Sequence, residues 1–329
     1  MKSGDLEAAK SILAPYLKSN PKDSSALQLA DQLKQADLYL SQTKKYAAAN
    51  KHEACISNAN AAIEIISQSS SLREMRADCH FALNQIEEGA GDLSRAVSMN
   101  PSSAPLLLKL SLINYLILQT DTQIALTPIK QCLHFDPDSK ICKGWFRSLK
   151  PFEKDLTKAR NFIEGGRWAS AANLLDPRGK EGLIAEAQGL IEKYKEDLPV
   201  SEKESKLITM LMGWACKAHL KNGSTRLAVG VCDSVLLRDP ENVDGLICKG
   251  EQLIKKEDWE EAVKVLSDAF EKTGRRDADV HESLQKAQRG LKRSKSKDYY
   301  KVRHGWEHAI RSLLLMHALT GPQGLTRCG

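Results

Sequence analysis

The chain has 329 residues and a net charge of +6, with 42% hydrophobic and only 5% aromatic residues. Such a composition, rich in Ala, Leu, Lys and Glu, favours long helices over a β-rich core. Basic residues alternate with acidic ones, which indicates solvated helix faces and not nucleic-acid binding. No apolar run reaches the roughly 18 residues that a membrane-spanning helix needs.

The chain enters a helix almost at its first residue. Residues 5–18 predict an amphipathic helix, and no secretory signal precedes it. It has the character of the second helix of a hairpin, yet no room exists before it for a first helix. We therefore expect residues 1–23 to be a partial repeat and Met1 to be an internal start of a longer protein.

Short motifs then recur at a regular spacing. Trp259 is followed by Ala262, Leu266 and Ala269, and Trp168 is followed by Ala171. The small residue is needed because the two helices of a hairpin cross closely there. A period of about 34 residues with this pattern resembles the tetratricopeptide unit, a helix–turn–helix repeat. Equivalent small positions occur at Ala9, Ala54, Gly89, Ala125, Ala171, Ala228 and Ala262.

The sequence therefore predicts an all-α fold, a tetratricopeptide-repeat superhelix (α-solenoid) of about seven helical hairpins. Four Asn-Pro or Asp-Pro pairs, at Pro21, Pro101, Pro137 and Pro240, are each expected to close a helix. Long spacings indicate first helices extended over residues 24–48 and 138–164, and Pro151 is expected to bend or restart the second of these. Residues 172–199 contain an insertion that breaks or lengthens a second helix.

The end of the repeat array is followed by a polar segment and a short motif. Residues 277–295 predict a capping helix, which leads into a basic linker. We divide the chain into seven segments. These are 1–23 (partial repeat), 24–137 (repeat block), 138–199 (long helices and insertion), 200–276 (repeat block), 277–297 (capping helix and linker), 298–302 (start of a J-domain) and 303–329 (aberrant tail).

The motif at the end of the linker is Asp298-Tyr299-Tyr300-Lys301-Val302, which resembles the opening of a J-domain. The sequence departs from that pattern at Arg303, and no His-Pro-Asp tripeptide occurs in the chain. With the segments 72–79 and 281–289, this motif is similar to the endoplasmic-reticulum tetratricopeptide and J-domain co-chaperones, the inhibitor-of-protein-kinase type of DnaJ protein. The resemblance covers about residues 1–302.

The resemblance implies a function in protein folding and the unfolded protein response. Full-length members would bind unfolded or misfolded clients in the lumen of the endoplasmic reticulum and hand them to the Hsp70-type chaperone BiP. Because the J-domain is missing here, we expect a binding scaffold that does not stimulate an ATPase. A general assembly scaffold and a carboxylate-clamp adaptor remain alternatives; for the clamp, only Lys109 and Asn114 lie on one first helix.

The eight cysteines form no CxxC or metal-ligand array, so we expect no metal. Cys132 and Cys142 lie five residues on either side of one predicted turn, and Cys216 and Cys232 lie eight residues on either side of another. Their spacing permits disulfides, but by itself it favours buried free thiols. The family resemblance favours the disulfides, because the family has cysteines with these two separations. No partner is evident for Cys55, Cys79, Cys248 and Cys328.

Asn222-Gly223-Ser224 is an N-glycosylation sequon at the second of these turns, and we expect Asn222 to be modified in the full-length secreted protein. No glycine-rich phosphate loop, nucleophile elbow or HExxH helix is present. The sequence therefore predicts neither catalytic nor cofactor-binding residues, and no enzyme activity. The expected partners are proteins, with neither nucleic acid nor a membrane span.

Overall fold

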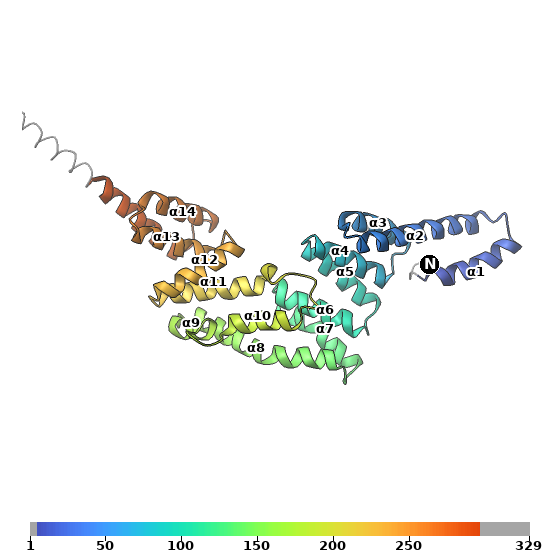
Figure 1. The fold of residues 1–329 in the computed structure, drawn as a ribbon, viewed down its shortest axis with the longest axis horizontal. Coiled ribbons are helices and arrows are strands. Elements are labelled where there is room, and N and C mark those ends of the chain that lie inside the picture. Colours follow the sequence, from blue (N-terminus) through green and yellow to red (C-terminus); the bar gives the residue numbers. More distant parts are fainter. Residues whose placement is uncertain (1–4, 297–329) are drawn as a thin grey trace, which may run out of the picture. The chain divides into compact units, whose positions relative to one another are not determined.

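The computed structural model describes residues 5–296, except for the side chain of Thr225. Within this range the regular elements are helices, without a single strand. The chain divides into two compact units, Met1–Asn222 and Gly223–Gly329, which we describe separately (Figure 1). The predicted seven-segment division is not tested by these two units and stays a prediction. None of the described helices is long and apolar enough to cross a membrane.

The first unit holds eleven α-helices, one π-helix and one 3₁₀-helix among its described residues. They are α1 (Leu6–Ser19), α2 (Ser24–Ala48), α3 (His52–Ile65), α4 (Ser70–Ala82), α5 (Ile86–Met99), α6 (Ala104–Leu112), η1 (Ile113–Ile117), α7 (Thr122–Phe135), α8 (Lys140–Glu164), α9 (Trp168–Leu175), α10 (Leu183–Lys193), η2 (Glu202–Glu204) and α11 (Lys206–Lys221).

The second unit holds α12 (Thr225–Arg238), α13 (Val243–Lys255) and α14 (Trp259–Lys272). Residues 278–296 are helical as well, as the capping helix predicted for 277–295 requires. Leu284 and Ala287 of this last helix pack with Ala262 and Leu266 of α14 in one apolar core. At Gly290 an added Cβ would lie 2.1 Å from the Trp259 ring, so only glycine lets this helix approach α14 so closely.

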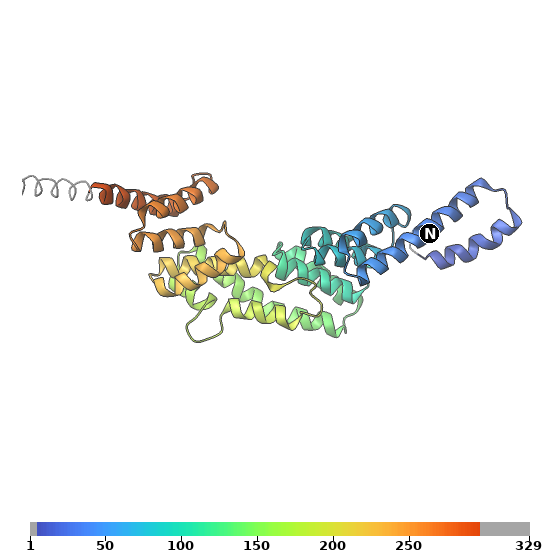
Figure 2. The same cartoon turned by 45° about the horizontal axis from the view of Figure 1, so that its top comes forward.

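The long helix α2 packs against two neighbouring helices. α1 lies against its N-terminal half and α3 against its C-terminal half, as Figure 2 shows. Leu6 of α1, Leu33 of α2 and Ala59 of α3 belong to one buried cluster that joins the three helices. The extended first helix predicted for residues 24–48 is confirmed.

The prolines end helices as predicted. α1, α5, α7 and α12 stop one residue before the Asn-Pro and Asp-Pro pairs, so that the Asn or Asp is the C-cap. Pro151 behaves differently, because α8, which is 25 residues long in all, continues through it. Of the two outcomes expected at Pro151, the restart was therefore wrong and the bend stays a prediction. The insertion in residues 172–199 does break a helix: α9 ends at Leu175, and α10 begins at Leu183.

The small residues predicted at helix crossings are mostly buried. Gly89, Ala125, Ala171, Ala228 and Ala262 are fully buried, and at Gly89 a Cβ would lie 2.4 Å from the Phe81 ring. The assignment in α3 was wrong by one residue. Cys55 is fully buried there and Ala54 only half-buried, because Cys55, Ala59 and Ala62 form the inward stripe of α3.

Candidate functional site

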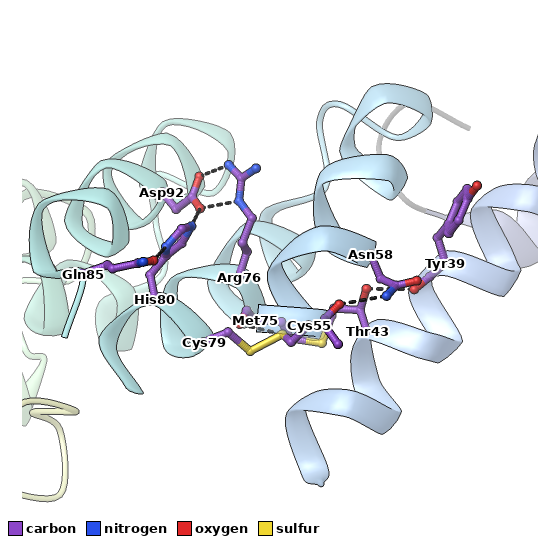
Figure 3. Close-up of a disulfide and its surroundings, with 11 residues drawn as sticks. Tyr39, Thr43, Cys55, Asn58, Met75, Arg76, Cys79, His80, Gln85 and Asp92 are labelled. Atoms are coloured by element: carbon purple, nitrogen blue, oxygen red, sulfur yellow. Dashed lines mark hydrogen bonds and ion pairs between the residues drawn. A yellow bond between two sulfur atoms is a disulfide. The ribbon is translucent and has the colours of Figure 1, made fainter. Parts of the chain in front are cut away.

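Two disulfides link successive repeats of the first unit. Cys132 and Cys142, a pair predicted from the sequence, join the end of α7 to the start of α8 with a Cα–Cα distance of 6.4 Å. Cys55 and Cys79 join α3 to α4 at the same Cα–Cα distance (Figure 3). Each bridge runs from the second helix of one repeat to the first helix of the next. The bridges therefore fix the stacking of repeats and not the closure of a single hairpin.

The Cys55–Cys79 bridge was missed from the sequence, although a signal for it exists. The two cysteines lie twelve residues on either side of Ser67, in the turn between α3 and α4. This is the symmetry that pointed to Cys132 and Cys142. The larger separation weakens this signal, since residues far from a turn come level only if both helices stay straight.

The remaining predicted site residues have different outcomes. Cys216 and Cys232 are both buried and both disulfide-bonded, and they fall in different units, so their pairing with each other stays a prediction. Cys248 is a buried free thiol, and burial raises its pKa. Asn222 is exposed at the C-cap of α11, which leaves it accessible to modification. The predicted J-domain start Asp298, Tyr299, Tyr300 and Lys301, and the tail 303–329, lie outside the described residues.

A buried carboxylate organises the charges next to the Cys55–Cys79 bridge. Asp92 of α5 is 1% exposed, and Arg73, Arg76 and His80 on one face of α4 converge on it. Figure 3 shows Arg76 and His80 beside Asp92. Arg76 donates from Nε to Asp92 Oδ2 at 2.6 Å and from Nη2 to Oδ1 at 2.5 Å. His80 Nε2 lies 4.0 Å from Oδ2. We call these four residues, with Asn60 and Arg95, the Asp92 cluster.

The cationic groups of the Asp92 cluster bond to acceptors within the cluster. The third guanidinium nitrogen of Arg76, Nη1, donates to Asn60 Oδ1 of α3 at 2.6 Å. A groove of about 540 Å³ opens beside the cluster, but Glu87 and Glu88 also line it. Because Arg76 already has acceptors on two sides and acidic groups surround it, the cluster ties α3, α4 and α5 together and leaves little positive charge for a ligand.

A second polar contact holds the π-helix η1. Tyr115 Oη donates to a Glu153 carboxylate oxygen of α8, and Thr122 Oγ1 donates to the other oxygen at 3.1 Å. Burial raises the pKa of Tyr115 far above its usual value, and the bond to Glu153 raises it further. Tyr115 therefore stays a neutral donor that anchors η1 to α8, and it offers no acid–base chemistry near neutral pH.

The geometry argues against the carboxylate clamp. The ammonium of Lys109 lies 2.5 Å from Asp78 Oδ1 and also 6.0 Å from the centre of the Phe81 ring. Lys109 is thus committed to a neighbouring repeat, and its side chain would have to break an ion pair to bind a terminal carboxylate.

Five large apolar side chains of the first two helices are exposed. Ile12 is 73% exposed and Leu38 is 54% exposed. Three further residues of these helices, Tyr16, Leu27 and Leu29, are also large, apolar and exposed. We call these five residues the N-terminal apolar surface. Leu27 and Leu38 lie eleven residues apart and so share one face of α2, whereas Leu29 lies on another face. Exposed apolar groups that share a face are characteristic of surfaces that bind other proteins.

The chain is similar to known proteins along nearly its whole length. It is 37% identical to the "Tetratricopeptide repeat and J domain-containing co-chaperone DNJ1" of Cryptococcus neoformans, over 92% of this chain and 59% of that protein. It is 27% identical to the human "DnaJ homolog subfamily C member 3", over 92% of this chain and 56% of that protein. The chain thus spans less than two thirds of the length of these relatives. No protein-family model matches it.

The fold also has a solved counterpart. The crystal structure of the P58(IPK) TPR domain superimposes with a TM-score of 0.69 at 23% identity, covering 89% of this chain and 76% of that one. This likeness confirms the tetratricopeptide superhelix predicted from the sequence.

Proposed function

We propose that this chain, a homologue of the tetratricopeptide repeat and J domain-containing co-chaperones, binds unfolded clients for transfer to an Hsp70-type chaperone. Its homology and its fold make it a non-enzymatic, chaperone-related scaffold. For the full-length protein we propose BiP as that chaperone and the lumen of the endoplasmic reticulum as its location. The two disulfides of the first unit support this location, since disulfides persist in oxidising compartments.

The N-terminal apolar surface is the observation that carries client binding. Unfolded chains expose apolar side chains, and the transfer of such surface from water stabilises a complex by about 25 cal/mol per Å². Ile12 and Leu38 are well placed to make these contacts because neither is needed for the buried core around Leu33.

The test is the suppression of client aggregation without ATP. We expect the full chain to reduce light scattering from a chemically denatured reporter enzyme, and a variant with Ile12→Ser and Leu38→Ser to lose most of this activity. Leu237→Ser, which changes an exposed leucine of the second unit, is the matched control and should keep it. Equal suppression by all three proteins would contradict client binding at this surface.

Transfer to BiP needs its own experiment. We expect this chain to form a complex with unfolded client but to leave the ATPase rate of BiP unchanged in single-turnover assays. A chimera that carries an intact J-domain after residue 302 should accelerate it. Clear stimulation by the chain itself would overturn the assignment of ATPase stimulation to the J-domain alone.

A further inference from the structure

The helices α12, α13 and α14 repeat the arrangement of α3, α4 and α5. Each begins 173 residues after its counterpart: Thr225 against His52, Val243 against Ser70, and Trp259 against Ile86. The helix lengths agree as well, 14, 13 and 14 residues in both sets. The turn residues Asn84 and Glu257, which occupy equivalent places, both have positive φ, 59° and 61°. Residues of the two sets can therefore be compared one by one.

In the second set, the basic residue at the position of Arg76 has no buried carboxylate beside it. The positions of Asn60, Arg76 and Asp92 in the first set are occupied by Asp233, Lys249 and Val265 in the second. Val265 is 8% exposed and carries no charge, so nothing replaces the buried carboxylate that holds Arg76. Among the residues that the structure describes, Lys249 and Lys256 have no ion-pair partner within 4.0 Å.

The same replacements make the floor of the groove apolar. Leu253 stands where the first set has His80, and Leu237 stands where it has Glu64. With Leu236 they line a groove of about 380 Å³ between α12 and α13. Leu237 is 87% exposed, although burial of such a side chain is worth about 2 kcal/mol. The groove therefore combines one exposed leucine and two half-buried ones with two free ammonium groups and one carboxylate, Asp233, on its other wall.

We propose that this groove, the α12–α13 groove, binds an acidic amphipathic peptide segment of a partner protein. Lys249 lies on α13 and Lys256 is the C-cap of this helix, seven residues further on and so about 10 Å along the same face. The partner would place carboxylates over these two lysines and an aliphatic side chain between them, against Leu253 and Leu237. Charge selects this occupant, because the groove carries two unpaired lysines against one aspartate. A basic or neutral apolar peptide would leave both lysines unpaired.

This binding goes beyond the proposed capture of clients, which involves the N-terminal apolar surface of the other unit. The two functions can fail separately. A chain that lost aggregation suppression through Ile12→Ser and Leu38→Ser would keep peptide binding in the α12–α13 groove, and the reverse would hold for groove variants.

The direct test is fluorescence anisotropy with the full chain. The probe is a blocked helical peptide with leucines on one face and two glutamates one heptad apart on their flanks. A second probe has lysines in place of the glutamates. We expect saturable binding of the glutamate probe, weakening as salt is raised because the contacts are exposed ion pairs. Lys249→Gln with Lys256→Gln should lower the affinity by about tenfold.

The controls separate charge recognition from a general effect on folding. Lys264→Gln removes an exposed lysine of α14 outside the groove, and it should leave the affinity unchanged. Lys249→Glu with Lys256→Glu should lose the glutamate probe and gain the lysine probe. Absence of saturable binding, equal affinity for both probes, or indifference to the double substitution would each overturn the proposal.

Discussion

The helix set α3–α5 and the helix set α12–α14 have one backbone and two chemistries. In the first set, Arg76 is held by Asp92 and Asn60, and Cys55 is bonded to Cys79. In the second set the matching residues are Lys249, Val265, Asp233, Ala228 and Gln252. The polar groups of the first set thus bond to one another, whereas the second set leaves two lysines available to a partner. The repeat fixes where side chains point, and a few substitutions decide whether they stabilise the array or bind something else.

Removal of the buried carboxylate should have the largest effect. Asp92→Asn leaves Arg73 and Arg76 partly buried beside a neutral amide, and we expect a loss of about 3 kcal/mol in the free energy of unfolding. Urea unfolding followed by circular dichroism measures it. Val265→Ala at the equivalent position is the control, with a cost of about 1 kcal/mol for the lost methyl groups. Equal costs at the two positions would contradict the internal role of the Asp92 cluster.

Removal of the Cys55–Cys79 disulfide should cause the second-largest loss in the free energy of unfolding. The bridge spans 24 residues, so the loop-closure entropy that it removes from the unfolded chain is worth about 3 kcal/mol. Cys55→Ala with Cys79→Ala should lower stability by that order. Removal of Cys132 and Cys142, which are ten residues apart, should cost somewhat less. Urea midpoints of the two double variants decide the order, and a larger loss from the shorter loop would contradict it.

The crossing of α4 and α5 gives a third contrast. Gly89→Ala would push a methyl group to 2.4 Å from the Phe81 ring, and we expect it to cost about 2 kcal/mol. The second set already has Ala262 at this place, because the smaller Ile254 stands where the first set has Phe81. Phe81→Ile in the Gly89→Ala background should therefore recover part of the loss. Thermal unfolding of the single and double variants measures this, and additive costs would exclude a contact between the two side chains.

The smallest effect concerns an exposed ion pair. Lys206 Nζ lies 2.6 Å from Glu87 Oε1, and this bond lowers the pKa of Glu87. A carboxyl whose folded pKa is lowered stabilises the protein above its unfolded pKa and loses this contribution as the pH falls through the folded pKa. Glu87→Gln should cost less than about 1 kcal/mol at pH 7, since the pair is solvated. The difference from the unchanged chain should shrink as the pH falls through the lowered pKa of Glu87 and vanish below it; a difference that does not change with pH would refute the pair.

Much of the fold follows from the sequence because the repeat fixes small residues where helices cross and proline where they end. Gly89, Ala125 and Ala262 are buried as predicted, and α5 ends at Met99 with Asn100 as its C-cap, as expected from Pro101. The one-residue error at Ala54 arose because Cys55 is itself small enough for a crossing. The passage of α8 through Pro151 was missed because the hydrogen bond that a proline removes is a local cost, whereas the burial of Leu149 and Phe152 that offsets it depends on tertiary packing.

The sites were harder to predict than the fold. The pairing of Cys55 with Cys79, the burial of Asp92 and the π-helix at Ile113–Ile117 all depend on how helices lie against one another, which local patterns do not record. The α12–α13 groove could not be seen either. Lys249 looks like an ordinary surface lysine until its place is compared with that of Arg76.

Unfolded clients and acidic peptides are proposed to bind at two separate surfaces. Hydrogen exchange measured by mass spectrometry tests this separation most directly. We predict that a permanently unfolded client, such as a reduced and alkylated secretory protein, slows amide exchange in α1 and α2 of the full chain. The acidic helical peptide should slow it in α12 and α13 instead. Protection of the same helices by both ligands, or of neither region by its own ligand, would contradict the account.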